Sequence, residues 1–132
     1  MDPAQTALEL HADTINRRAA EEYRRTMHYP FTYQNYNGVA LTIERAEDCG
    51  VSEPFPWDII LRTDPEWSHT DFESVEVLAR SISSAVFKVS FRRVDNQGAA
   101  SSLYDAIWIA THRDERWAIQ FRHNLGERSE SG

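Results

Sequence analysis

The chain has 132 residues, of which 41% are hydrophobic and 11% aromatic, enough to fill the core of one ordinary domain but too few for two. Its net charge of −7 argues against nucleic acid as the main partner, because phosphate binding needs clustered lysines and arginines. The single cysteine, Cys49, excludes an intrachain disulfide, and no apolar run approaches the length that spans a bilayer. The first residues lack the basic and apolar regions of a signal peptide, so the sequence predicts a cytoplasmic protein without a membrane partner.

The first thirty residues have the pattern of helices. Asp2 and Pro3 are suited to the N-cap and first turn of a helix. An apolar stripe then recurs at spacings of three and four, through Leu8, Ala12, Ile15, Ala19, Tyr23 and Met27. Asn16 is a candidate break between two helices, and Pro30 is expected to end the helical region.

After Pro30 the period changes to two, which is typical of strands. Residues 31–36 and 39–43 predict a hairpin around the turn Asn37-Gly38. Short helices are expected at 44–49 and 56–61. Four β-prone segments follow, with short loops that favour antiparallel neighbours: 67–80, 85–94, 102–111 and 116–125. The sequence therefore predicts an α+β fold, a single domain over 1–126 with N-terminal helices packed in a strongly curved, mixed or antiparallel sheet, and a disordered tail over 127–132.

Several segments resemble the NTF2-like superfamily, also described as SnoaL-like or ketosteroid-isomerase-like. Residues 27–33 are similar to its helix-to-strand junction, and Trp67-Ser68-His69-Thr70 to the opening of its third strand. Residues 89–98 and 116–123 look like its fourth and last strands. The resemblance implies a cone, in which the sheet wraps around the helices and leaves a pocket, and a homodimer formed through the outer sheet face. The superfamily includes isomerases, dehydratases and cyclases as well as proteins without known activity, so the site must be argued from side chains.

Strand alternation indicates which side chains face that pocket. In the last strand Phe121 and His123 share the parity of Trp117 and Ile119, so all four are expected to point inward. Arg93 is placed inward in the same way by Phe87, Val89 and Phe91. Val75 and Val77 indicate an inward face for the third strand, which would carry His69 and Asp71 to the pocket mouth.

These residues suggest candidate roles. His69, Asp71 and His123 are the candidate catalytic acids and bases. Arg93 is a candidate for holding an anion, against the alternative of a structural ion pair with Asp71 or Asp105. The candidate substrate-binding residues are Tyr33, Trp57, Trp67, Phe91, Arg93, Tyr104 and Phe121.

Other features carry weaker signals. His69, Asp71 and His123 are also the residue types of a two-histidine, one-carboxylate metal site, a minor alternative, and no metal or cofactor is expected. His11 and His112 are expected at the surface, and Cys49 as an inert thiol.

Two functions fit these patterns. The first is a cofactor-independent isomerase, dehydratase or cyclase that acts on a small apolar organic ligand by proton transfer. The second is a non-catalytic homodimer that binds a ligand or a protein. The residues that converge in the pocket would discriminate between them.

Overall fold

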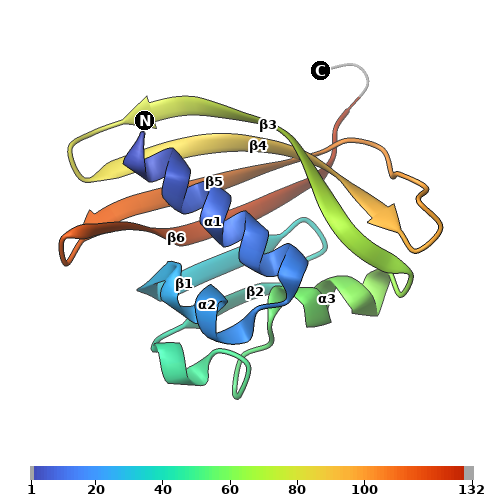
Figure 1. The fold of residues 1–132 in the computed structure, drawn as a ribbon, viewed down its shortest axis with the longest axis horizontal. Helices are drawn as coiled ribbons and strands as arrows, with labels where there is room; N and C mark the ends of the chain where they lie inside the picture. Colours follow the sequence, from blue (N-terminus) through green and yellow to red (C-terminus); the bar gives the residue numbers. More distant parts are fainter. Residues whose placement is uncertain (1, 130–132) are drawn as a thin grey trace.

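The computed structural model describes residues 2–129, in which helices pack against one side of a curved sheet (Figure 1). The helices are α1 (Pro3–Arg17), α2 (Ala20–Arg25) and α3 (Pro56–Thr63), with a 3₁₀ helix at Ala46–Asp48. The strands are β1 (Met27–Asn35), β2 (Ala40–Ile43), β3 (Trp67–Arg80), β4 (Ser84–Asp95), β5 (Tyr104–Arg113) and β6 (Arg116–Glu127). This arrangement confirms the predicted α+β class.

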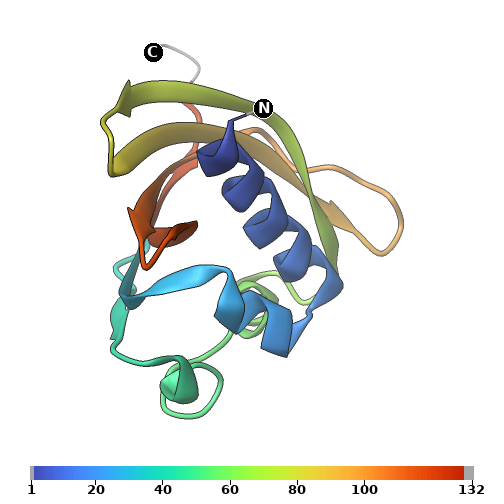
Figure 2. The same ribbon diagram turned by 60° about the vertical axis from the view of Figure 1, so that its left-hand side comes forward.

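The sheet has the strand order β2-β1-β6-β5-β4-β3. All neighbours are antiparallel except β1 and β6, which run parallel and join the first hairpin to the last strand of the meander. Figure 2 shows the strands bending around α1, which packs on β3, β5 and β6. The concave side of the sheet, covered by α1, therefore forms the core, and the convex side faces away from the helices.

The start of α1 follows from its sequence. A side-chain oxygen of Asp2 accepts a hydrogen bond from the amide of Ala4 (3.0 Å), and Pro3 occupies the first turn, as expected. The helix ends at Arg18, which adopts a left-handed conformation with φ of 52°. Asn16 is therefore not the break. Its side chain instead binds the backbone of Thr70 on β3, through two hydrogen bonds of 2.8 Å.

The helical region is shorter than the sequence predicted. α2 ends at Arg25, and the hydroxyl of Thr26 donates to the carbonyl of Tyr23 (2.7 Å). Met27 already belongs to β1, where it pairs with Ile119 and is fully buried, so Pro30 lies inside a strand. The expectation that Pro30 ends the helices was wrong, because the backbone already pairs with β6 at Met27.

The C-terminal segment is tied to the sheet beyond the predicted end of the last strand. β6 continues to Glu127, and the guanidinium of Arg128 binds both carboxylate oxygens of Asp105 at 2.8 Å. Of the tail expected over 127–132, Glu127 thus belongs to β6 and Arg128 binds the sheet, while residues 130–132 lie outside the described residues. In residues 2–129 no helix combines the length and the apolar character needed to cross a bilayer.

Candidate functional site

A cavity of about 60 Å³ lies between the helices and the concave face of the sheet. Its apolar lining comes from α1, α3 and three strands: Ile15, Pro56, Ile60, Phe72, Phe91, Ala106 and Trp108. Its polar lining consists of Tyr33, Thr70, Arg93, Arg122 and Asn124. A cavity of this volume holds several water molecules or part of a small organic molecule, and its mixture of aromatic walls and few polar groups is typical of ligand sites.

Cross-strand pairing explains which β3 residues reach the cavity. A register shift between Trp67 and His69 leaves Ser68 as an extra residue, so that Thr70 pairs with Arg93 and Phe72 with Phe91. Paired residues share a face of the sheet, and Phe91 and Arg93 face inward. The bulge therefore turns Thr70 and Phe72 into the cavity.

A second bulge has the same effect in β6. Phe121 pairs with Ile109 and Ile119 with Ala110, which leaves Gln120 as the extra residue. Beyond this bulge Arg122 pairs with Trp108 and Asn124 with Ala106, both of which line the cavity. Arg122 and Asn124 accordingly point inward, opposite to the alternation that the sequence suggested.

Arg122 is 5% exposed and lies among aromatic rings. Its Nη1 donates to Nε2 of His11 (3.0 Å), and its Nη2 donates to the hydroxyl of Tyr23 (2.9 Å). Its guanidinium carbon lies 5.1 Å from the ring centre of Phe31 and 5.2 Å from that of Tyr33. Such contacts stabilise a cation, but none of them supplies a negative charge.

These contacts fix the protonation of His11. A guanidinium only donates, so Nε2 of His11 accepts and Nδ1 carries the proton toward Thr26 Oγ1 (2.7 Å). Burial lowers the pKa of His11 well below its ordinary value, and the charge of Arg122 lowers it further. His11, which we expected at the surface, is fully buried and neutral.

Arg93 is 9% exposed, and its guanidinium carbon lies 5.2 Å from the ring centre of Tyr104. Within residues 2–129 it has no ion pair. The alternative pairing with Asp71 or Asp105 is wrong, because Asp71 is exposed and Asp105 binds Arg128. The Nε atoms of Arg93 and Arg122 are both buried without a hydrogen-bond partner among these residues.

The other candidate binding residues have different positions. Tyr33 and Phe91 line the cavity with Arg93. Trp57 stacks on Phe55 with ring centres 4.5 Å apart and belongs to the core. Tyr104 stacks on Phe91 beside the cavity, whereas Phe121 lies on the convex face after the β6 bulge.

Trp67 lies behind the cavity wall. It is 2% exposed, lies under the guanidinium of Arg18 at 4.6 Å, and its Nε1 donates to Oγ1 of Thr70 (3.1 Å). Trp67 therefore positions Thr70 and is not part of the lining.

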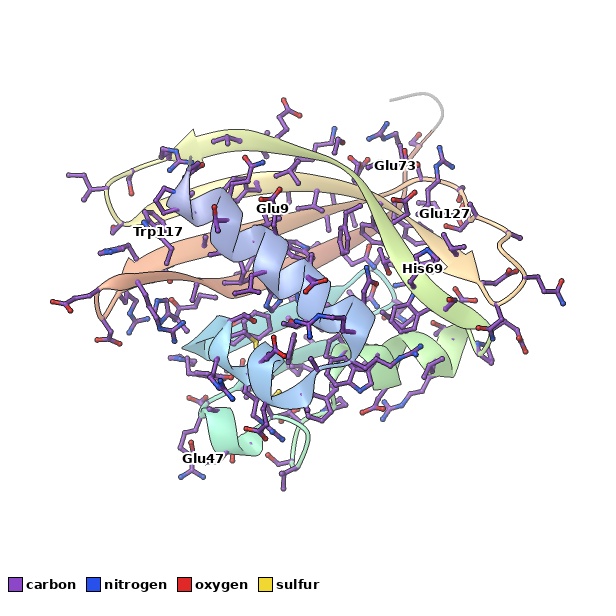
Figure 3. The ribbon with its side chains drawn as sticks, in the orientation of Figure 1. Glu9, Glu47, His69, Glu73, Trp117 and Glu127 are labelled. Atoms are coloured by element: carbon purple, nitrogen blue, oxygen red, sulfur yellow. The ribbon has the colours of Figure 1, made fainter. Side chains whose placement is uncertain are left out.

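The candidate catalytic residues do not converge. His69 and Asp71 project from β3 and are exposed, outside the cavity lining (Figure 3 labels His69). His123 lies on the convex face, where its Nδ1 is 2.8 Å from Oε1 of Gln34. The expected inward orientation was wrong for all three, because the bulges at Ser68 and Gln120 reverse the alternation. In the described part of the chain no group of three histidine, cysteine or acidic residues is placed to hold a metal ion, so this triad does not assemble.

The two remaining predictions concern His112 and Cys49. His112 is exposed, as expected, and its ring lies 5.4 Å from that of Trp117. Cys49 is a buried free thiol whose pKa is raised by burial.

Sequence reasoning missed Arg122, Asn124 and His11 as residues of this site. His11 had a usable signal, since it lies three residues after Leu8 and four before Ile15, on the same helix face. Arg122 and Asn124 gave no such signal, because their orientation depends on a bulge that local composition does not reveal.

Comparisons with known proteins show which solved structures this chain resembles. No family model and no curated protein matches the chain. Solved structures do match. An uncharacterized cystatin-like protein from Caulobacter vibrioides has 15% identity and a TM-score of 0.71, with 98% of this chain and 91% of that chain covered. An NTF2-like protein with a cystatin-like fold from Novosphingobium aromaticivorans has 9% identity and a TM-score of 0.70, with 98% and 83% covered.

A third similar structure is a candidate Ca/calmodulin-dependent kinase II association domain from Exiguobacterium sibiricum. It has 14% identity and a TM-score of 0.66, with 97% of this chain and 93% of that chain covered. At these identities the likeness concerns the fold. The chain has the cystatin-like, NTF2-like α+β fold that the sequence resemblance implied.

Proposed function

We propose that this chain, a protein with the NTF2-like fold, binds a small organic molecule in the cavity of its cone. The observation that carries the proposal is the pair of buried, unpaired Nε atoms of Arg93 and Arg122 at the wall of an otherwise largely apolar cavity. A buried donor without a partner costs about 1 to 3 kcal/mol, and a bound ligand that accepts these hydrogen bonds removes that cost.

The composition of the wall favours binding over acid–base catalysis. Within residues 2–129 the lining contains no carboxylate and no imidazole, and its ionisable groups are two arginines and Tyr33. Burial raises the pKa of Tyr33, so its hydroxyl remains protonated near neutral pH. The guanidinium group of arginine stays protonated at this pH and therefore cannot act as a base. These groups donate hydrogen bonds and stabilise charge, which suits a receptor or carrier.

Ligand binding can be tested by native mass spectrometry of gently purified protein, followed by thermal denaturation against a fragment library. A molecule that binds the folded protein raises the midpoint of unfolding, and the rise increases with the ratio of ligand concentration to Kd. Ala106→Val adds methyl groups to the cavity wall and should abolish the effect. Ala79→Val, at an exposed position of β3, is the control. The proposal is wrong if no fragment binds, or if binding survives in Ala106→Val.

We also propose a homodimer formed through the convex face of the sheet. Ile107, Ile109 and Phe121 form a half-buried apolar group there, on the paired strands β5 and β6. The similarity to a candidate association domain supports assembly through this fold without identifying the partner.

A further inference from the structure

Two positive charges lie at the wall of the cavity without a negative partner. Arg93 on β4 and Arg122 on β6 are 9% and 5% exposed. In residues 2–129 neither has a carboxylate oxygen within 4.0 Å, whereas six other arginines form ion pairs: Arg17, Arg24, Arg45, Arg80, Arg92 and Arg128. The chain as a whole is negatively charged, with a net charge of −7.

The unused hydrogen-bonding capacity of the two arginines differs. Each Nη of Arg122 donates one hydrogen bond, to His11 or to Tyr23, whereas its Nε is buried and makes none. The side chain of Arg93 makes no hydrogen bond within the described residues, and its Nε is buried as well. The site therefore offers the guanidinium fork of Arg93 and, in addition, Nε of Arg122.

Both charges lie at the wall of the same cavity. Tyr33, which lies opposite Arg122 in the β1–β6 pairing, has its ring centre 5.2 Å from the guanidinium carbon of Arg122. Burial raises the pKa of Tyr33, and both arginines oppose that rise. Buried charges are normally paired, because an uncompensated one costs several kcal/mol.

We infer that the ligand of this cavity carries a carboxylate, held by Arg93 and by Nε of Arg122, with its apolar part against Phe72, Phe91 and Trp108. The inference rests on the proposed function and names the chemical class of its ligand. A carboxylate is flat, carries one charge and matches the guanidinium fork through two parallel hydrogen bonds. Phosphate has no apolar part, so the aromatic and aliphatic side chains that make up most of the lining would have nothing to contact.

Benzoate and benzamide test the charge directly, because they share shape and ring but differ in the anionic group. Isothermal titration of the unmodified protein should show saturable binding of benzoate and binding of benzamide at least about tenfold weaker, as expected for hydrogen bonds to a charged group. Acetate, hexanoate and their amides extend the comparison to other shapes, and inorganic phosphate tests a general anion site.

A pair of neighbouring variants locates the binding site. Arg93→Gln removes one of the two positive charges of the cavity and should weaken benzoate about ten- to hundredfold, with little effect on benzamide. Arg92→Gln is the matched control. Arg92 directly precedes Arg93 on β4 and binds Glu73 on the opposite face of the sheet. It should retain benzoate binding. Circular dichroism establishes that both variants fold, and the comparison of benzoate with benzamide needs no variant.

The outcomes separate the inference from the function on which it rests. If amides bind as tightly as the acids, or if Arg93→Gln has no effect, the inference of a carboxylate ligand is wrong. The proposal that the cavity binds a small molecule would still stand. Phosphate binding without benzoate binding also overturns it. If neither acids nor amides bind and the fragment library gives no ligand, both proposals are wrong.

Discussion

His11 makes the stability of the fold depend on pH. Its pKa is low in the folded protein because burial and Arg122 disfavour the imidazolium, whereas the unfolded chain has the ordinary value. As the pH falls below about 6.5, the unfolded state binds a proton that the folded state does not, so stability decreases by up to about 1.4 kcal/mol per pH unit. We expect His11→Gln to reduce this slope, measured by urea denaturation between about pH 7.5 and about pH 5.5.

A second histidine provides the control. His112 is exposed, and His112→Gln should keep the slope of the unmodified protein. Burial also lowers the pKa of His28, but His28 is present in all three proteins and does not affect the comparison. Equal slopes in the unmodified protein and in His11→Gln would show that the imidazole is not buried as described.

Asp105 changes stability with pH in the same direction as His11, but at lower pH. Hydrogen bonds from Arg128, opposed by burial and helped by Ser90, lower the pKa of Asp105 to about 2. A carboxyl with a lowered folded pKa adds stability above its unfolded pKa and loses it as the pH falls toward 2. Allowing for the 40% exposure of the Arg128 side chain, we expect Asp105→Asn to cost about 1 to 2 kcal/mol near pH 7.

Denaturant titration at two pH values checks this expectation. The deficit of Asp105→Asn should be smaller near pH 3 than near pH 7, because the carboxylate is partly lost in the parent. Asp71→Asn, at an exposed position, should be nearly neutral at both. If Asp105→Asn lost the same stability at both pH values, the cause would be lost packing and not a lost ion pair.

At the scale of elements, one side chain connects α1 to the sheet. Asn16 donates to the carbonyl of Thr70 and accepts from its amide, both at 2.8 Å, which closes the edge of β3 against the helix. Asn16→Ala leaves two partly buried backbone groups unpaired, so we expect a loss of about 1 to 3 kcal/mol. Faster hydrogen exchange at the Thr70 amide would place the effect at this contact.

The control for this prediction lies on the same helix. Glu9 is exposed on α1 (Figure 3), and Glu9→Ala should change stability by less than about 0.5 kcal/mol. If both variants are equally stable, the Asn16 contact does not hold β3 in place.

The elements themselves were predictable, whereas the faces of two strands were not. Helix α3 and strands β3 to β6 lie close to their expected ranges, because apolar periodicity and turn residues are local signals. Alternation also placed Phe91 and Arg93 correctly, since β4 carries no extra residue of its own. In β3 and β6 the same reasoning failed after Ser68 and Gln120, because a bulge is set by pairing with the neighbouring strand.

For the whole molecule, the order of motifs was more informative than any single motif. The segments that resemble the superfamily lie between residues 27 and 123, and together they implied the fold that the solved structures share. The cavity walls required distant segments to meet, such as His11 on α1 with Arg122 on β6, and their contact depends on tertiary packing.

Assembly can be tested at the same scale. If the convex face forms a homodimer, light scattering should give twice the 15.3 kDa of one chain. Phe121→Lys places a charge among the apolar residues of that face and should yield a monomer. Ile82→Lys, at a position that is 95% exposed on the β3–β4 turn, should remain dimeric. A monomeric parent, or a dimer unaffected by Phe121→Lys, would contradict this interface.

The bulge at Gln120 makes this part of β6 tolerant of a change in chain length. Without this residue, Phe121 would follow Ile119 directly and still lie opposite Ile109, so Arg122 and Asn124 would keep their inward positions. Loss of one codon would then remove the bulge and leave the same residues on the cavity wall. Insertions and deletions at strand bulges can thus accumulate in this fold without a change of ligand, and a gap at such a position in an alignment says little about the site.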